Sequence, residues 1–401
     1  MDLVECLFCR KSFGHDPFSP FCPECGEPLM VAPVSADKPQ TIRAGAASPF
    51  ETFADFLPLS SFDRTLSLGE GGTPLVPLGR LAAGLGLPSV LAKNESQNPT
   101  GSFKDRGTAL AIQKAVALGL RRIGTVSTGN MAASTAAYGA RAGLRTYVLL
   151  KEGTPRTSVQ NAGIFGPVLI TVRGDYGRLF YESLQVGRKL GIWFMNSVDP
   201  FRIEGYKVTG FEIFLQLGRR APGFIFVPLS SGGHLLGLMR AFEDLERAGL
   251  VGQYPTFVGV QAEGCAPLVK AFEAGRPKYE PLKEARTIAH AISNPGPPAG
   301  NAVLKLIADR KGMLVSVSDG EMLEAQRALA SAEGLFCQPE SAVALAGLTK
   351  LRADGRMGHV TSAVLVLTGS GLKSPHALDA VPLEVHELGF EDLEGRLETL
   401  L

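Results

Sequence analysis

The sequence predicts an α/β fold in which helices cover both faces of parallel sheets, preceded by a small cysteine-bearing unit. Short β-type runs alternate with helical patterns along most of the chain, and this alternation is typical of parallel strands joined by helices. Hydrophobic residues make up 45% and charged residues 20% of the 401 residues. Such a chain is long and apolar enough for two or three domains with a sizeable core.

The cysteine-bearing unit occupies residues 1–30 and contains two C-x-x-C pairs a short loop apart. These pairs are Cys6 with Cys9 and Cys22 with Cys25. Four thiolates at this spacing suit one tetrahedral zinc ion, as in a zinc ribbon. Because the protein supplies all four ligands, such an ion is structural and leaves no position open for catalysis. A knuckle without metal is the alternative.

The rest of the chain follows in order. Residues 31–50 are rich in Ala, Pro and Ser and are expected to form a connector. The strands expected after it are 89–92, 123–126, 146–150, 168–172, 224–227, 256–260 and 362–367. The expected helices are 108–118, 131–142, 178–190, 235–248, 319–332 and 341–351. We expect the C-terminal residues, 376–401, to form a tail that wraps the body.

The charge balance excludes some classes of function. The formal net charge is +1, so no long-range field favours nucleic acid or an anionic membrane, and the expected partner is a small molecule. No run approaches the roughly 20 apolar residues that a membrane helix needs. Residues 1–8 do not have the pattern of a signal peptide. We therefore expect a cytoplasmic protein.

Lys104 belongs to the segment 98–107, which reads NPTGSFKDRG and leads directly into the expected helix 108–118. A lysine held in a compact turn, out of water, loses its proton more readily and can attack an aldehyde to form a Schiff base. For this segment by itself, a helix N-terminus with Lys104 in solvent is the alternative.

A second motif ends the expected strand 123–126 and reads STGN, from Ser127 through Thr128 and Gly129 to Asn130. Free backbone N–H groups at the start of the next helix, together with the hydroxyl groups, suit a carboxylate. Asn130 as a simple helix N-cap is the alternative.

A third motif is a small-residue loop between the expected strand 224–227 and the expected helix 235–248. A strand, a Gly- and Ser-rich loop and a helix N-terminus suit a phosphate, because backbone donors converge there and the helix dipole favours an anion. The loop is neither a Walker loop nor a G-x-G-x-x-G motif. Its residues are Ser230, Ser231, Gly232, Gly233 and His234.

A fourth motif starts with Thr368 at the end of the expected strand 362–367. Its hydroxyl can hydrogen-bond a heterocyclic nitrogen without supplying charge, although an ordinary strand-end turn is the alternative. Together the four motifs predict one ligand that carries an aldehyde, a phosphate and a ring nitrogen. They also predict a substrate that carries a carboxylate. Pyridoxal 5′-phosphate is the ligand that carries the first three groups.

With these motifs in this order, the chain resembles the fold-type II pyridoxal-phosphate enzymes, and among them the threonine synthases. The resemblance covers residues 66–375 and includes GEGGTPL at 69–75, the Lys104 segment and TGSGLK at 368–373. It implies two open, twisted, mostly parallel sheets flanked by helices, in a homodimer. The implied domains are a large cofactor-binding domain at 51–95 and 205–375 and a small α/β domain at 96–204.

The resemblance also implies roles for the motif residues. Lys104 would hold the cofactor as an internal aldimine and move protons, with Phe103 near the cofactor ring. Asn130 would bond the ring hydroxyl, the loop 230–234 the cofactor phosphate and Thr368 the ring nitrogen. The substrate carboxylate would lie on Ser127, Thr128 and Gly129. The candidates for a substrate phosphate are Asn196, Ser197 and Arg202.

The implied reaction converts O-phospho-L-homoserine and water to L-threonine and phosphate by γ-elimination and β-addition. The sequence departs from the threonine synthase pattern at Met131, in the loop 230–234 and at 293–298, which reads SNPGPP. These departures bear on the substrate more than on the cofactor. A cysteate synthase, a serine/threonine dehydratase or a non-catalytic ligand-binding relative are therefore the alternatives.

Overall fold

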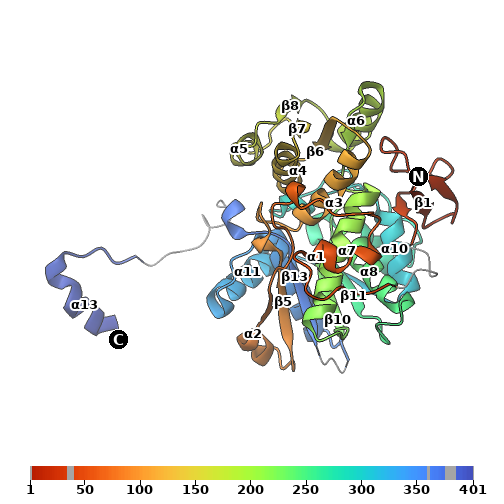
Figure 1. Ribbon diagram of the computed structural model, residues 1–401. Coiled ribbons are helices and arrows are strands. Elements are labelled where there is room, and N and C mark those ends of the chain that lie inside the picture. Colours follow the sequence, from red (N-terminus) through yellow and green to blue (C-terminus); the bar gives the residue numbers. More distant parts are fainter. Residues whose placement is uncertain (1, 34–39, 359–361, 375–384, 401) are drawn as a thin grey trace.

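Two sheets form the framework of the chain (Figure 1). The structure, a computed structural model, describes residues 2–33, 40–358, 362–374 and 385–400. The larger sheet has six strands in the order β12-β11-β10-β13-β5-β4, all parallel except β4, which runs antiparallel to β5 at the edge. Their bounds are β4 Leu75–Pro77, β5 Val90–Asn94, β10 Phe224–Pro228, β11 Thr256–Ala262, β12 Met313–Val317 and β13 Ala363–Leu367.

The smaller sheet has four parallel strands in the order β8-β7-β6-β9. Their bounds are β6 Arg122–Val126, β7 Arg145–Lys151, β8 Val168–Val172 and β9 Trp193–Phe194. The predicted pair of mostly parallel sheets is therefore confirmed. The large and small domains and their boundaries stay a proposal.

Helices flank both sheets, and all six predicted helices are present. They correspond to α3 Lys104–Ala117, α4 Asn130–Arg141, α6 Tyr176–Leu190, α8 Gly233–Arg247, α11 Asp319–Glu333 and α12 Pro339–Ala353. The remaining helices within the described parts are α1 Pro49–Thr52, α2 Gly79–Gly84, α5 Arg156–Gly163, α7 Pro200–Gln216, α9 Pro267–Glu273, α10 Gly300–Asp309 and α13 Leu393–Leu400. None of them is both long and apolar enough to cross a membrane.

Helix α7 is the most buried of the helices that the sequence analysis missed. It packs between α3 and α8, and polar residues such as Glu204, Lys207 and Glu212 are buried in it together with the apolar ones. A helix buried on all sides shows no apolar stripe against a polar face, so the usual periodicity is absent. Asp199 caps its N-terminus through the backbone N–H groups of Phe201 and Arg202.

A buried network of charged side chains connects α7 to α3 and to the large sheet. The Arg106 guanidinium lies 2.6 Å from Glu95 and 2.7 Å from Glu212, and the Lys93 amine lies 2.6 Å from Glu212. Burial by itself would raise the pKa of Glu95, but the charge of Arg106 holds that pKa below its usual value. Each side chain of this network therefore stays charged in the interior because its partners compensate its charge.

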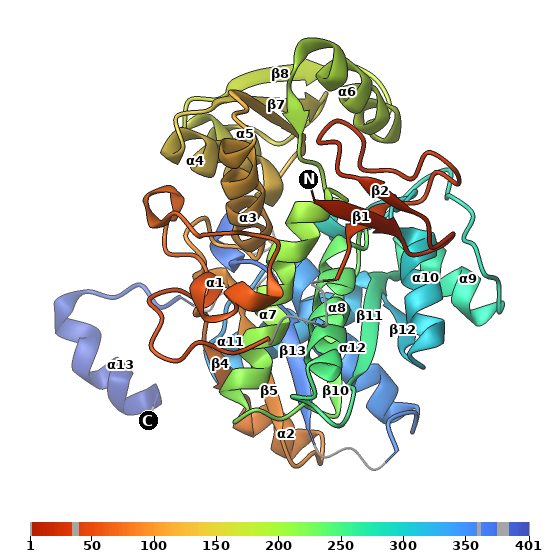
Figure 2. The same ribbon diagram turned by 45° about the vertical axis from the view of Figure 1, so that its right-hand side comes forward.

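The cysteine-bearing unit is a three-stranded sheet of β1 Leu3–Cys6, β2 Ser12–Gly14 and β3 Leu29–Val31, all antiparallel. It lies beside helices that flank the smaller sheet and helices that flank the larger sheet (Figure 2). Asp2 pairs with Lys114 of α3 and Asp16 with Arg188 of α6. On the other side, Glu27 accepts a hydrogen bond from Asn301 of α10. The unit therefore touches helices next to both sheets.

The prediction that the C-terminal tail wraps the body is wrong. Helix α13 and the residues just before it stand apart from the sheets in both views (Figures 1 and 2). Its apolar residues are exposed, and Phe390 is 96% exposed. Residues 376–384, which begin the predicted tail, lie outside the described part of the chain.

The ion network yields a stability prediction. Replacing Arg106 with Leu leaves Glu95 and Glu212 buried without their main counter-charge, and we expect a loss of about 3–5 kcal/mol in the free energy of unfolding. Urea unfolding followed by circular dichroism measures this loss. The control is Arg173→Ala, which removes the exposed pair with Glu152 and should change stability little. Equal effects of the two variants would contradict the assigned role of the network.

Candidate active site

Lys104 is the first residue of α3, and the loop before it is attached to the end of β13. Phe103 N–H donates to Thr368 O at 3.0 Å, and Ser102 and Gly369 form an isolated antiparallel β-bridge. Gly101 has a φ of +75°, which favours glycine at this turn. The turn therefore brings the Lys104 segment and the TGSGLK segment together, as the sequence analysis expected.

The Lys104 amine lies 4.3 Å from the centre of the Phe103 ring. Burial and the nearby charge of Arg202 lower the pKa of Lys104 from 10.5 to about 7. Within the described residues, the amine has no hydrogen bond or ion pair. A large fraction of this amine is therefore neutral at physiological pH, which a nucleophile or a proton carrier requires.

The STGN segment lies between β6 and α4. Asn130 is not an N-cap, because Gly129 occupies that position. Its side-chain N–H instead donates to Gln338 Oε1 at 2.7 Å. The backbone N–H groups of Thr128 and Asn130 donate to no acceptor within the described residues, so they are free for a ligand.

Thr368 lies at the end of β13, where its hydroxyl is 2.9 Å from that of Ser341. A side chain at Gly369 would come within 2.3 Å of the Gln338 amide oxygen, so it would displace the Gln338 amide from its position beside Asn130. The sequence analysis missed Gln338 and Ser341. The signal available was Pro339, which starts α12 beside them.

The loop 230–234 turns from β10 into α8. Gly232 has a φ of +98°, and a side chain at Gly233 would come within 2.4 Å of the Ser197 carbonyl oxygen. The backbone N–H groups of residues 231–234 donate to no acceptor in the described part of the chain. Together with the N-terminus of α8, they form a cradle that fits a phosphate.

His234 connects this loop to the Lys104 segment. Its ring stacks on Phe103 with 3.7 Å between the ring centres and 15° between the planes. Burial, followed by the charges of Lys104 and Arg106, lowers the pKa of His234 well below 6.5. Both ring nitrogens are buried without a partner in the described residues. This neutral ring is therefore a candidate ligand contact in the centre of the site.

Arg202 is fully buried on α7 beside Lys104. Its guanidinium donates to the Met195 carbonyl and to the hydroxyl groups of Thr108 and Thr135, at 2.5, 2.8 and 2.6 Å. No carboxylate of the described residues pairs with it. The charge of Arg202 acts on the buried carboxyl of Asp199, which caps α7, but no carboxylate hydrogen-bonds the guanidinium. This position therefore favours a ligand that carries a negative charge.

The other two candidates for a substrate phosphate lie differently. The Asn196 amide accepts from the Val126 N–H at 2.8 Å and donates to the Ser183 hydroxyl at 3.1 Å. It therefore supports the end of β6, and its amide is not free for a ligand in this structure. Ser197 is partly exposed and lies against Gly233 in the phosphate cradle.

The four cysteines of the N-terminal unit converge on one point. Their sulfur atoms all lie within 4.8 Å of one another, with Cys6 and Cys25 at 3.4 Å and Cys9 and Cys22 at 3.6 Å. Four sulfurs bound to zinc at about 2.3 Å lie about 3.8 Å apart, so the cluster fits a tetrahedral zinc ion.

The fold and these sites agree with the comparison to known families. Residues 66–369 match the family described as pyridoxal-phosphate dependent enzymes. The chain belongs to this family. Its members share the α/β fold described above, and the cofactor that gives the family its name fits the amine, the phosphate cradle and the strand-end hydroxyl group.

Curated relatives and solved structures extend this result. The chain is 35% identical to a threonine synthase of Methanocaldococcus jannaschii, over 94% of each chain. Among solved structures, maize serine racemase has a TM-score of 0.65 at 18% identity, over 82% of this chain and 92% of that one. A threonine deaminase of Solanum lycopersicum has a TM-score of 0.64 at 19% identity, over 81% and 82%. These two structures show the fold alone.

The lowered pKa of Lys104 predicts how cofactor uptake depends on pH. Since only the neutral amine attacks an aldehyde, the rate at which the cofactor-free enzyme becomes yellow with pyridoxal phosphate should rise with pH, with a midpoint near 7. Stopped-flow absorbance measures this rate. Arg202→Gln removes the second cause of the shift and should move the midpoint upward. A midpoint near 10 in the unaltered protein would contradict the prediction.

Proposed function

We propose that the protein is a threonine synthase, which converts O-phospho-L-homoserine and water to L-threonine and phosphate. The observation that carries this proposal is the unpaired, buried guanidinium of Arg202 beside the Lys104 amine. A phosphate on the substrate supplies the missing negative charge, and its oxygens are stronger acceptors for an arginine than the hydroxyl groups of Thr108 and Thr135. The identity with curated threonine synthases supports the same reaction.

The residues of the site divide between the cofactor and the substrate. Lys104 would hold the cofactor through its aldehyde, with Phe103 near the ring and Asn130 as the partner of the ring hydroxyl. The loop 230–234 would hold the cofactor phosphate, and the neutral Thr368 hydroxyl would be the partner of the ring nitrogen. Ser127, Thr128 and Gly129 receive the substrate carboxylate, and the site for the substrate phosphate lies at Ser197 and Arg202, with Asn196 behind them.

Lys104 moves the protons. With a pKa of about 7, its amine can take a proton from the substrate carbon and return one later at the same pH. When bound, the cofactor supplies the electron sink that makes these carbon-bound protons acidic. The neighbouring charge of Arg202 lowers the pKa of this amine. An anion bound at Arg202 should therefore raise the pKa of Lys104.

Product analysis by mass spectrometry tests the reaction. We expect O-phosphohomoserine to give threonine and phosphate in equal amounts, and Lys104→Ala to give neither. Phosphoserine with sulfite, and serine or threonine alone, are the parallel substrates. Cysteate formed from phosphoserine and sulfite would indicate a cysteate synthase. An oxo acid and ammonia formed from serine or threonine would indicate a dehydratase, whose reaction does not require an anion at Arg202. Cysteate, or an oxo acid with ammonia, formed without any threonine from O-phosphohomoserine would overturn the proposal.

We also propose that the cysteine-bearing unit holds one structural zinc ion through Cys6, Cys9, Cys22 and Cys25. The homodimer and the cytoplasmic location stay predictions from the sequence. Metal analysis of the purified protein should find one zinc ion per chain, and Cys9→Ser should lower both this content and the melting temperature. Cys265→Ser, which alters a buried cysteine far from the cluster in sequence, is the control. A metal content that Cys9→Ser leaves unchanged would contradict the assignment.

A further inference from the structure

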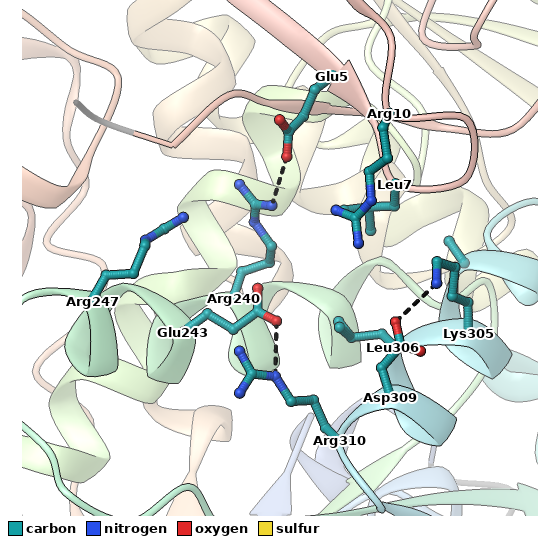
Figure 3. A pocket seen from close by; sticks show the side chains of 11 residues that line it. Glu5, Leu7, Arg10, Arg240, Glu243, Arg247, Lys305, Leu306, Asp309 and Arg310 are labelled. Carbon is teal, nitrogen blue, oxygen red and sulfur yellow. Dashed lines mark hydrogen bonds and ion pairs between the residues drawn. The ribbon is translucent and has the colours of Figure 1, made fainter. Parts of the chain in front are cut away.

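A cavity of about 280 Å³ lies where the cysteine-bearing unit meets α8 and α10 (Figure 3). Glu5 and Arg10 line it from the cysteine-bearing unit, Arg240 and Arg247 from α8, and Lys305 from α10. None of these residues belongs to the candidate active site. At this volume, slightly below that of typical ligand pockets, the cavity suits a small molecule and not a macromolecule.

Cations outnumber anions in the lining. Five cationic side chains face three carboxylates. Three of the cations are paired: Lys305 with Asp309 at 3.0 Å, Arg310 with Glu243 at 3.2 Å, and Arg247 with Asp244, which lies outside the lining. The guanidinium of Arg10 has no hydrogen bond or ion pair within the described residues. Among the paired and unpaired cations of the lining, Arg10 therefore remains for an anion.

Arg240 is the second observation that points to a ligand. It is only 3% exposed, and its guanidinium donates to the Val31 carbonyl at 2.9 Å. Its contact with Glu5 is long, at 3.7 Å, and its Nε is buried without a hydrogen-bond partner in the described part of the chain. A buried donor without an acceptor costs stability, and the guanidinium of Arg240, which lines the cavity, has no close carboxylate partner.

The turn that carries the first cysteine pair fixes the position of Arg10. Arg10 has a φ of +60°, a left-handed conformation that a side chain other than glycine rarely adopts. Its N–H donates to the Cys6 carbonyl at 2.9 Å, so the turn that holds the first cysteine pair also holds Arg10. Figure 3 shows the Arg10 side chain extending from this turn toward the gap above α8, which the Arg240 side chain enters from the opposite side.

We propose that this cavity binds a small phosphate-bearing anion, a phosphate monoester or a diphosphate, between Arg10 and Arg240. Arginine offers a planar pair of donors that matches phosphate oxygens. The bound anion connects the cysteine-bearing unit to α8, the helix whose N-terminus forms the phosphate cradle at 232–234. It therefore stabilises the docked position of the cysteine-bearing unit. This site is independent of the proposed reaction.

Isothermal titration of the full-length, cofactor-loaded protein with pyrophosphate tests the proposal. Arg10→Gly suits the left-handed backbone and therefore keeps the fold, and we expect it to weaken pyrophosphate binding at least tenfold. Arg247→Gln should weaken binding by a smaller factor. Arg141→Gln, on α4 and outside the cavity lining, is the matched control and should bind like the unaltered protein. Equal zinc content in all variants confirms that the cysteine cluster is intact.

A second measurement locates the binding. Hydrogen exchange of residues 3–14 should slow when pyrophosphate is added to the unaltered protein, and it should not slow in Arg10→Gly. The proposal is overturned if the unaltered protein does not bind pyrophosphate, or if Arg10→Gly binds it with unchanged affinity. The latter result would place the anion at another site, such as that of the substrate phosphate. Turnover of O-phosphohomoserine tests the proposed reaction separately.

Discussion

Arg106 lies two residues after Lys104 and holds the start of α3 against α7 through its contacts with Glu212. The same guanidinium pairs with Glu95, just after β5, so it also attaches α3 to the large sheet. Because these charges are all buried, removing one leaves the others without compensation. The position of Lys104 therefore depends on a network that makes no contact with the reacting atoms.

The chemistry of the site follows from this arrangement. Helix α7 carries Arg202 to a position beside Lys104, where its charge and the surrounding burial lower the pKa of the amine to about 7. The same Arg202 has only neutral acceptors in the described residues. One buried cation therefore lowers the pKa of Lys104, and we propose that the same cation attracts an anionic group of the substrate.

The cysteine-bearing unit is attached to the rest of the chain by contacts on two sides. Its contacts with Lys114 and Arg188 on one side, and with Asn301 and Arg240 on the other, attach it to helices beside both sheets. Small cysteine-bearing units have little apolar core of their own, so a metal ion and docking contacts stabilise them. Charged side chains make several of these docking contacts, and three arginines of α8 and the cysteine-bearing unit line the cavity between them.

The sequence by itself determined the α/β class, the parallel strands, six helices and the four segments that meet around Lys104, because these depend on local patterns and on turn residues such as Gly101 and Gly232. It did not reveal α7, whose buried polar residues hide the periodicity of a helix. Nor could it find Gln338, or the partners of Arg106 and Arg202. Glu212, Gln338 and Thr108 lie 94 to 208 positions from the residues that they bond. Only the packing of the tertiary structure decides which buried charges find a partner and which remain for a ligand.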